Sequence, residues 1–317
     1  LSARIKYMLI NKPRLNLRYA NRGLDLKTLA VHDKKFHADD VLAAMLLRAI
    51  YPNIKIVRTR DQNKVEECDV AVDVGGSYDF ENLKFDHHQE GKAGKRANGI
   101  EYSGVGLVWK HWGIEICKGK VDLFEFIDSK IIQPVDAQDN GQSLHTNLVF
   151  GVNDFNLDNI NSMALNPSLT EKGMDDGLFE EAMDLFEYIF GRILKRQFEA
   201  FELKEQILKE YSKLEDSRFL IHEEFKPVLK FSSEMPNLLF YLYKDGNDKR
   251  WVIRAIPGKT EFTNRKNLPA KWAGKEGSAL DKASGIKGMT FCHNNLFICG
   301  AKNKEAILKA LRLALEN

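Results

Sequence analysis

Histidines and aspartates gather in the first third of the 317-residue chain, where their types and spacing suit metal chemistry. Four of the eight histidines fall between residues 32 and 88, each close to an aspartate. Mixed imidazole and carboxylate ligands suit Mn, Fe, Co or Zn, whereas Mg is favoured where carboxylates dominate. Two metals that share a carboxylate can activate water and hold a phosphoryl group. The residues concerned are His32, His37, Asp39, Asp73, Asp86, His87 and His88.

Each of these blocks also has a plain structural interpretation. Asp73, in the run Val-Asp-Val-Gly-Gly, is typical of a turn or a helix cap. Asp39 and Asp40 suit the positive end of a helix, and Asp86-His87-His88 suits a solvated loop. Since all these interpretations together require a coincidence, we favour a metal site.

Short apolar runs alternate with helical patterns from Leu29 onward. This alternation is typical of a parallel α/β sheet, in which functional groups collect at the carboxyl ends of the strands. The histidines and aspartates fall at those ends, so we expect them to converge on one edge of the sheet. The pattern predicts a helix over 39–50 and strands at 29–31, 54–58, 70–74 and 83–86.

The middle of the chain predicts a helical connection. A helix is expected over 121–132, ending before Pro134. Residues 151–177 are rich in Asn, Asp and Gly, which indicates a domain boundary. From Leu178 a helical period continues towards Leu214, with room for one break.

Beyond Asp216 the pattern returns to short strands, expected at 228–231, 238–243 and 251–256, and ends in a helix over 304–315. We therefore predict an α/β protein in which a long helix joins a parallel-sheet catalytic domain to a smaller α/β substrate-binding domain. The predicted parts are a basic N-terminal arm or leader, the catalytic domain, a linker with the connecting helix, and the substrate-binding domain, at residues 1–28, 29–165, 166–215 and 216–317.

Composition excludes several classes of protein. The net charge of +2 excludes a uniform polycation that binds nucleic acid through charge alone. The four cysteines form no CxxC pair, so neither a disulfide framework nor a cysteine zinc site is expected. The apolar runs are too short to span a bilayer, so we expect a soluble protein.

The first 24 residues carry six Lys or Arg and no acid. A mitochondrial presequence has a similar composition, and an extended basic arm is the alternative. We expect a cytoplasmic protein, or a mitochondrial one if this leader is an import signal.

The motifs resemble those of a known family. Asp86-His87-His88 is similar to the motif that defines the DHH phosphoesterase superfamily. More closely, the chain resembles the melanocyte-proliferating-gene (MYG) exonuclease family of metal-dependent hydrolases over about 29–315. The resemblance is carried by VHDKKFHADDVLA (31–43), DVGGSYD (73–79), FDHHQ (85–89), PVDAQDNG (134–141), LNPSL (165–169), RAIP (254–257), LPAKWAG (268–274) and GIKGMTFCH (285–293).

This resemblance implies a dinuclear centre with Asp73 as the bridging ligand. One metal would be held by His32, His37 and Asp73, and the other by Asp39, Asp73, His87 and Asp136. Asp139 competes with Asp136 for the last position, and we prefer Asp136, with Asp139 as a supporting residue. Asp86 and His88 would be catalytic, with His88 facing the substrate phosphate. We expect two divalent ions, Mn first, with Mg, Fe, Co or Zn as alternatives.

The second domain contains many lysines and arginines interleaved with aromatic residues between 244 and 287. Such a mixture suits the binding of a single-stranded nucleic acid, whose backbone meets the cations and whose bases stack on the aromatic rings. A solvent-exposed lysine surface above core aromatic residues has the same composition. The resemblance favours the first interpretation, with Arg254, Arg265, Lys271 and His293 binding substrate. In the first domain, Ser103-Gly104-Val105-Gly106 is expected to open a helix whose N–H groups either meet phosphate or only pack on the sheet.

The function implied is a metal-dependent phosphodiesterase, a hydrolase of phosphoester bonds that acts as a 3′-to-5′ exonuclease on single-stranded RNA or short oligonucleotides. One alternative is hydrolysis of small phosphoesters, dinucleotides or pyrophosphate. Another is a non-catalytic RNA-binding protein with a structural metal site. We expect no membrane partner, and a homodimer is one oligomeric state to test.

Overall fold

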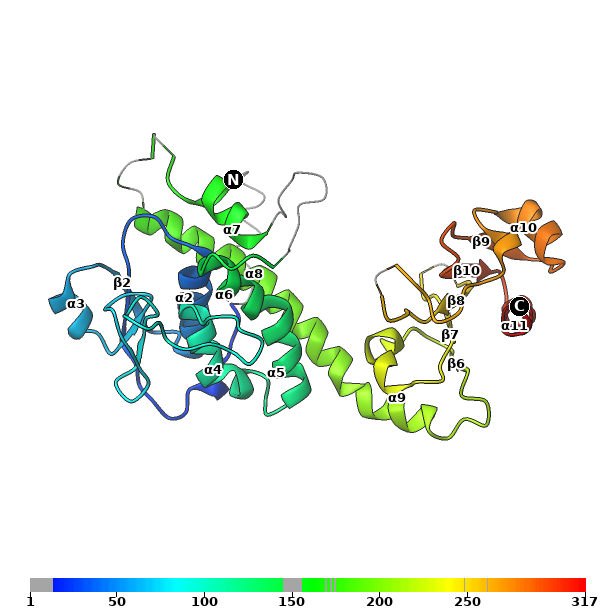
Figure 1. Cartoon of the computed structure of the whole chain (residues 1–317), viewed down its shortest axis with the longest axis horizontal. Helices are drawn as coiled ribbons and strands as arrows, with labels where there is room; N and C mark the ends of the chain where they lie inside the picture. Colours follow the sequence, from blue (N-terminus) through cyan, green and yellow to red (C-terminus); the bar gives the residue numbers. More distant parts are fainter. Residues whose placement is uncertain are drawn as a thin grey trace. The chain divides into compact units, whose positions relative to one another are not determined.

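Figure 1 shows the computed structural model, which describes residues 14–317 except 145–155, 169, 172, 174, 248 and 261. The chain divides into two compact units, residues 1–198 and 199–317. Each unit contains one five-stranded sheet with helices packed on it. The chain is therefore a mixed α/β protein, as the sequence predicted.

The sheet of the first unit is mainly parallel, with the strand order β2-β1-β3-β5-β4. Three pairs, β1 with β2, β1 with β3 and β3 with β5, are parallel, and β4 runs antiparallel to β5. The carboxyl ends of the parallel strands therefore meet at one edge. The strands are β1 (Thr28–Val31), β2 (Lys55–Arg58), β3 (Val70–Val72), β4 (Tyr78–Asp79) and β5 (Lys84–Phe85).

Helix α2 (Ala38–Ile50) is the central helix of this unit, and every one of its residues is buried. His37 and Asp40 form a capping box at its start, which satisfies N–H groups that a helix leaves free. The helix packs against α4 and α6. The other helical segments are α3 (Gln62–Glu66), α4 (Gly104–Ile116), α5 (Val121–Ile127), η2 (Asp128–Ile132), α6 (Gln133–Asp139), α7 (Leu157–Ile160) and η3 (Asn161–Leu165).

The helix expected to end before Pro134 instead continues to Asp139. A π-helical turn, η2, follows α5, and Pro134 then lies in the first turn of α6. Proline is tolerated there because the first N–H groups of a helix need no partner inside it. This continuation decides where the aspartates of α6 point.

Helix α8 (Asp175–Glu202) is long and amphipathic, and α9 (Lys204–Tyr211) follows it after a single break at Leu203. The long helix with one break is confirmed. The buried stripe of α8 recurs at helical spacing, at Phe179, Ala182, Met183, Phe186, Phe190 and Leu194. The division between the units falls within α8, between Phe198 and Glu199, and the predicted domain bounds at 165 and 215 stay predictions.

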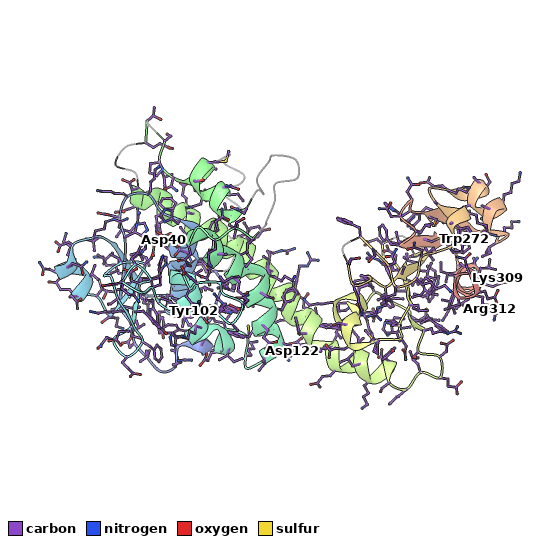
Figure 2. All side chains as sticks on the ribbon, in the orientation of Figure 1. Asp40, Tyr102, Asp122, Trp272, Lys309 and Arg312 are labelled. Carbon is purple, nitrogen blue, oxygen red and sulfur yellow. The ribbon has the colours of Figure 1, made fainter. Side chains whose placement is uncertain are left out.

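The sheet of the second unit has the strand order β6-β7-β8-β10-β9 and is antiparallel except between β6 and β7. Apolar cores cover both of its faces, one around the fully buried Trp272 (Figure 2) and one around Tyr241. The elements are β6 (Phe219–His222), η4 (Val228–Glu234), β7 (Phe240–Lys244), β8 (Trp251–Ala255), η5 (Ala270–Trp272), α10 (Gly277–Ser284), β9 (Met289–Cys292), β10 (Ile298–Ala301) and α11 (Lys304–Glu316).

The strand predicted at 228–231 is wrong, because these residues begin the 3-10 helix η4. Val228 and Phe231 are both buried, three residues apart. That spacing puts them on one face of a 3-10 helix. A short apolar run does not distinguish this from a buried strand.

The described part of the N-terminal segment packs onto the first unit. The N–H of Leu17 donates to Ala49 O at 2.9 Å, and the Tyr19 hydroxyl donates to Ile116 O at 2.8 Å. Leu17 and Ala20 are buried. Residues 14–27 are therefore not an extended arm, and residues 1–13 lie outside the described residues. None of the helices in the described ranges is long and apolar enough to cross a membrane.

Candidate metal centre

The predicted metal ligands come together at the carboxyl edge of the first sheet. Neighbouring strands β1, β3 and β5 end directly before His32, Asp73 and Asp86. The start of α2 adds His37 and two aspartates, and the end of α6 adds a further one. In the described part of the chain, three groups of potential ligands have atoms within 4.8 Å of one another: His32, His37 and Asp73; Asp73, His87 and His88; and His37, Asp39 and Asp139.

Asp73 is the central carboxylate. Its Oδ2 lies 3.2 Å from His32 Nε2, and its Oδ1 lies 3.2 Å from His87 Nε2. The two oxygens therefore face different histidines, as a bridging ligand requires. The backbone of Asp73 has φ of 54°, in the left-handed region that few residues other than glycine adopt. Such conformations persist where the surrounding structure enforces them, often at functional sites.

Several buried polar atoms of this cluster make no well-oriented hydrogen bond, although three of them lie within ion-pair distance of a neighbouring His or Asp. They are Asp39 Oδ1, Asp40 Oδ2, Asp73 Oδ1 and His87 Nε2. Burial of Asp39, and then the charges of Asp73 and Asp139, raise the pKa of the Asp39 carboxyl well above its usual range. Buried polar groups without partners are costly, and a bound cation removes that cost. The residues present therefore fit a divalent metal.

The two buried histidines are held as cations by the carboxylates around them. Burial opposes the charge on His32, but Asp40 and Asp73 outweigh it and raise its pKa to about 10. Burial likewise opposes the charge on His87, but Asp139 and Asp73 raise its pKa to about 10. A metal must displace these protons to bind, because only the neutral imidazole is a ligand.

Hydrogen bonds orient both rings for metal binding. His87 Nδ1 lies 3.3 Å from Asn140 Oδ1, and His32 Nδ1 lies 3.0 Å from Asp33 O. With the proton on Nδ1 in each case, Nε2 is left to face Asp73. Arg60 Nη2 also lies 2.9 Å from His32 Nδ1 and competes with this arrangement.

The structure does not bring Asp136 to the cluster, contrary to our preference. Asp136 is fully buried between α4 and α6, where it pairs with Arg96 and accepts hydrogen bonds from Ser103 N (3.1 Å) and Ser103 Oγ (2.7 Å). A Cβ at Gly106 would clash with the Asp136 carboxylate. Asp136 is thus enclosed by its own partners, and it holds two helices together.

Asp139, one turn later on α6, faces the cluster instead. Its Oδ2 lies 3.1 Å from His87 Nε2, and its Oδ1 lies 4.0 Å from His37 Nδ1. The geometry therefore favours Asp139 over Asp136 as the last ligand. His37 itself is half exposed at the rim of the cluster.

Asp40, labelled in Figure 2, is a site residue that sequence reasoning missed. It is fully buried, its Oδ2 lies 3.0 Å from His32 Nε2, and its Oδ1 accepts a hydrogen bond from the His37 N–H at 2.9 Å. The available signal was the consecutive pair Asp39-Asp40 in the first turn of a helix, which a cap alone does not require.

The three residues of the Asp-His-His motif have different environments. The side chain of His87 is 3% exposed and that of His88 is 61% exposed. Asp86 Oδ1 lies 2.8 Å from His88 Nδ1, and its Oδ2 accepts from Gly76 N at 2.6 Å. The hydrogen bond with Asp86 is the main cause that raises the pKa of His88. His88 is thus an oriented, solvent-facing imidazole with Nε2 free of Asp86.

Ser103 to Gly106 open helix α4, as predicted. The Gly104 N–H donates to Asp39 Oδ2 at 3.2 Å, and the Ser103 N–H donates to Asp136. These two N–H groups therefore bind carboxylates of the protein. The start of α4 positions the Asp39 carboxylate, and these N–H groups do not meet phosphate.

Of the four predicted substrate residues, Arg265 has a different role. Its guanidinium donates to four backbone carbonyls, those of Ser232 (2.6 Å), Met235 (2.5 Å), Pro236 (3.1 Å) and Leu238 (3.0 Å). Ser232 lies in η4, and the other three belong to the segment between η4 and β7. Arg265 thus fixes the fold of this segment, a use that composition did not distinguish from substrate binding.

Arg254 and His293 both lie beside Phe297 in the second unit. The Arg254 guanidinium carbon lies 5.7 Å from the centre of the Phe297 ring, and the His293 ring centre lies 4.5 Å from it. Lys271 is exposed on η5. Phe297 was not among the residues predicted from the sequence.

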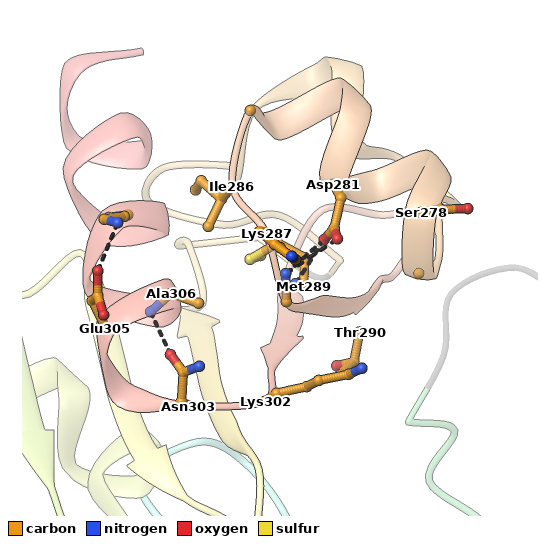
Figure 3. Close-up of a pocket in the computed structure, with 14 residues that line it drawn as sticks. Ser278, Asp281, Ile286, Lys287, Met289, Thr290, Lys302, Asn303, Glu305 and Ala306 are labelled. Carbon is orange, nitrogen blue, oxygen red and sulfur yellow. Dashed lines mark hydrogen bonds and ion pairs between the residues drawn. The ribbon is translucent and has the colours of Figure 1, made fainter.

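The second unit also has a cavity of about 950 Å³ between α10 and α11 (Figure 3). Asp281 closes one side of it by accepting hydrogen bonds from Gly288 N and Met289 N, and Asn303 caps α11 through Ala306 N. Asp281, Asn303 and Glu305 are thus used by the fold, the last through Lys309. In the described residues, all three ligand groups belong to the first unit.

Comparison with known proteins gives matches along nearly the whole chain. A family model described as "Uncharacterised protein family (UPF0160)" matches residues 28–315. The "MYG1 protein" of Dictyostelium discoideum is 32% identical, covering 90% of this chain and 95% of that protein. The "MYG1 exonuclease" of Homo sapiens is 28% identical, covering 90% of this chain and 85% of that protein.

Among solved structures, RecJ in complex with Mn2+ from Thermus thermophilus is 15% identical to this chain. The TM-score is 0.27, and the match covers 96% of this chain and 55% of that one. The predicted resemblance to the MYG family is confirmed by the family and sequence matches. The wider placement in the DHH superfamily stays a prediction.

Proposed function

This chain belongs to the uncharacterised protein family UPF0160, and we propose that it is a metal-dependent phosphodiesterase that shortens single-stranded RNA from its 3′ end. The observation that carries the proposal is the buried Asp73 carboxylate, whose two oxygens face two different histidines. Relatives named exonucleases support the reaction class.

The residues around Asp73 would hold two divalent ions. His32, His37 and Asp73 would hold one, and Asp39, Asp73, His87 and Asp139 the other, with the Asp40 carboxylate beside His32 Nε2 as a further oxygen donor. When bound, such ions supply Lewis acidity to the phosphoryl group and lower the pKa of a water molecule. Mn suits this mixed nitrogen and oxygen set, with Mg, Fe, Co and Zn as alternatives.

His88 would supply the proton that the leaving oxygen needs. Its Nε2 is the ring nitrogen turned away from Asp86, and the ring faces solvent beside Asp73. Asp86 keeps the opposite nitrogen, Nδ1, protonated and fixes the plane of the ring, so it acts as a positioning residue. Proton transfer from an oriented imidazole contributes about 10²- to 10⁴-fold to such reactions.

The second unit would bind the strand. Arg254 and His293 are proposed to contact the backbone of the substrate, and Lys271 is an exposed cation that would add attraction at low salt. Arg265 is left out of this set, because its donors are bound to carbonyls of the protein.

The test is a time course on 5′-labelled single-stranded RNA with Mn, Mg or EDTA. We expect a metal-dependent ladder that shortens from the 3′ end, and a loss of rate of about a thousandfold or more for Asp73→Ala, with lower metal content. Asp25→Ala is the matched control, since this aspartate is largely exposed, and it should behave as wild type.

Other outcomes would overturn the proposal. Hydrolysis of dinucleotides with long strands intact would make the chain a small-phosphoester hydrolase. Intact RNA in every lane, with metal still bound, would make it a binding protein. An unchanged rate and metal content in Asp73→Ala would place the centre elsewhere.

A further inference from the structure

The second unit has a group of planar side chains at the end of its sheet that the fold does not explain. Phe297 packs with neither of the two apolar cores described for this unit. It is half-buried beside the exposed His293. A large, partly exposed aromatic ring outside the core is typical of a binding surface.

The sheet register places the neighbours of Phe297 on one face. The His293 N–H donates to Ile298 O at 3.0 Å, and Ile298 lies opposite Arg254, which lies opposite Tyr241. Directly paired residues of antiparallel strands project their side chains to the same side. His293 and Arg254 therefore share one face of the sheet. Phe297 is the residue directly before β10.

Arg254 has no carboxylate partner among the described residues, and its charge acts on the neighbouring Tyr243 hydroxyl. Elsewhere in this unit Arg218 pairs with Asp216, Lys226 with Glu210 and Lys304 with Glu223. In the part of the chain that the structure describes, no acid lies within ion-pair distance of Arg254, and its Nε is buried without a hydrogen bond. A guanidinium in this state is suited to a phosphate or to the face of a base.

His293 presents a donor to solvent. Its Nδ1 accepts a hydrogen bond from Asn295 N at 3.1 Å, so the proton of the neutral ring is on Nε2. The ring is tilted by 53° to that of Phe297. The imidazole ring and the guanidinium plane are thus both fixed close to the Phe297 ring, and each of these groups stacks on nucleobases in proteins that bind single strands.

We propose that Phe297, with Arg254 and His293, is a stacking site for a nucleobase of the single-stranded substrate. This inference rests on the proposed function and adds how the strand is recognised: by the flat face of a base, with no preference for sequence, and by one phosphate beside Arg254. It makes Phe297 a binding residue and leaves the chemistry to the metal cluster.

The experiment measures binding without turnover. A short single-stranded RNA with 2-aminopurine near its 3′ end is titrated with protein in EDTA, and quenching reports stacking. We expect Phe297→Leu, which keeps apolar volume, to weaken binding about tenfold and to abolish quenching. Phe297→Trp should keep both. Arg254→Lys should weaken binding, because lysine keeps the charge but loses the plane.

Phe262 provides a matched control in the same unit. Its ring is 95% exposed, and no cation lies over it among the described residues. Phe262→Leu should leave affinity and quenching unchanged. Equal losses of RNA affinity in the Phe262 and Phe297 variants would show only general surface attraction and would overturn the proposal. Wild-type RNA affinity in Phe297→Leu would also overturn it.

The two proposals fail in different ways. If Asp73→Ala binds RNA normally and Phe297→Leu does not, the stacking site stands whether or not the wild-type protein cleaves. If the wild-type protein cleaves RNA and Phe297→Leu binds RNA as tightly as the wild type, the proposed metal chemistry stands and the proposed stacking site is wrong.

Discussion

Charge is handled differently in the two units. In the first unit, Asp39, Asp40 and Asp73 are buried almost completely within reach of one another. In the second unit, Arg254 on the central strand β8 and His293 directly after β9 lie beside a ring that takes no part in either core. Buried like charges are stable only with a fixed counter-charge, whereas a guanidinium and flat rings near the surface suit a ligand that binds and leaves. The first arrangement therefore fits a bound cation, and the second fits the substrate contacts proposed above.

Substitution of two aspartates on helix α6 gives the sharpest test of the buried cluster in the first unit. Asp139→Asn should lower metal affinity about 10- to 100-fold and keep the fold, because Asp139 faces His87. Metal content after dialysis and the rate on RNA measure this effect. Normal metal affinity would show that the cluster closes without Asp139.

Asp136→Asn on the same helix is the partner measurement. It removes the fully buried one of the two carboxylates that pair with Arg96 and leaves Asp128. We therefore expect a loss of about 3 kcal/mol in the free energy of unfolding, measured by urea denaturation. Metal affinity per folded molecule should stay near wild type. A loss of metal affinity as large as that of Asp139→Asn would restore Asp136 as a ligand.

Protons released on metal binding test the buried cluster as a whole. The pKa values of His32 and His87 are raised to about 10 in the metal-free protein, so both rings are protonated at pH 7 and must lose a proton when a metal binds. We expect about two protons per centre from the histidines at pH 7, measured with a pH indicator in weak buffer.

The same pKa shifts set the pH dependence of metal affinity. Groups with raised pKa stabilise the metal-free fold fully below the unfolded value near 6.5, and this stabilisation is lost as pH rises towards 10. Metal affinity should therefore rise with pH over this window. Constant affinity from pH 6.5 to 9 would contradict the assignment of these rings.

Substitution of Arg265 has the smallest expected effect, and it tests which arginine of the second unit contacts substrate. Arg265→Ala leaves backbone carbonyls near η4 without donors, and we expect a local destabilisation of about 1–3 kcal/mol. Faster hydrogen exchange of β7 amides measures it. RNA affinity should be kept, so a tenfold loss of affinity without faster exchange would return Arg265 to the substrate residues.

The alternation of strands and helices was enough to predict which residues converge at the sheet edge. Parallel strands end at a common edge, so His32, Asp73 and Asp86 had to be neighbours once the strands were identified. These are local features of the chain, visible in runs of a few residues.

The choice between Asp136 and Asp139 was not local. It depends on the rotation of α6, which is set by the π-helical turn η2 and by the burial of Arg96 against Asp136. Likewise, Arg254 and Arg265 look alike in the sequence, and only the carbonyls around Arg265 separate them. Such distinctions arise from packing between segments far apart in the chain.

Asp86 has a consequence for the recognition of distant relatives. It accepts hydrogen bonds from Gly76 N, His88 N and His88 Nδ1, so it shapes the loop even without a metal. A relative without a metal would still have a structural use for this aspartate. Under the proposed function, the first letter of the Asp-His-His motif therefore does not show by itself that a relative binds metal, and the counterparts of Asp73 and Asp139 are the positions to compare.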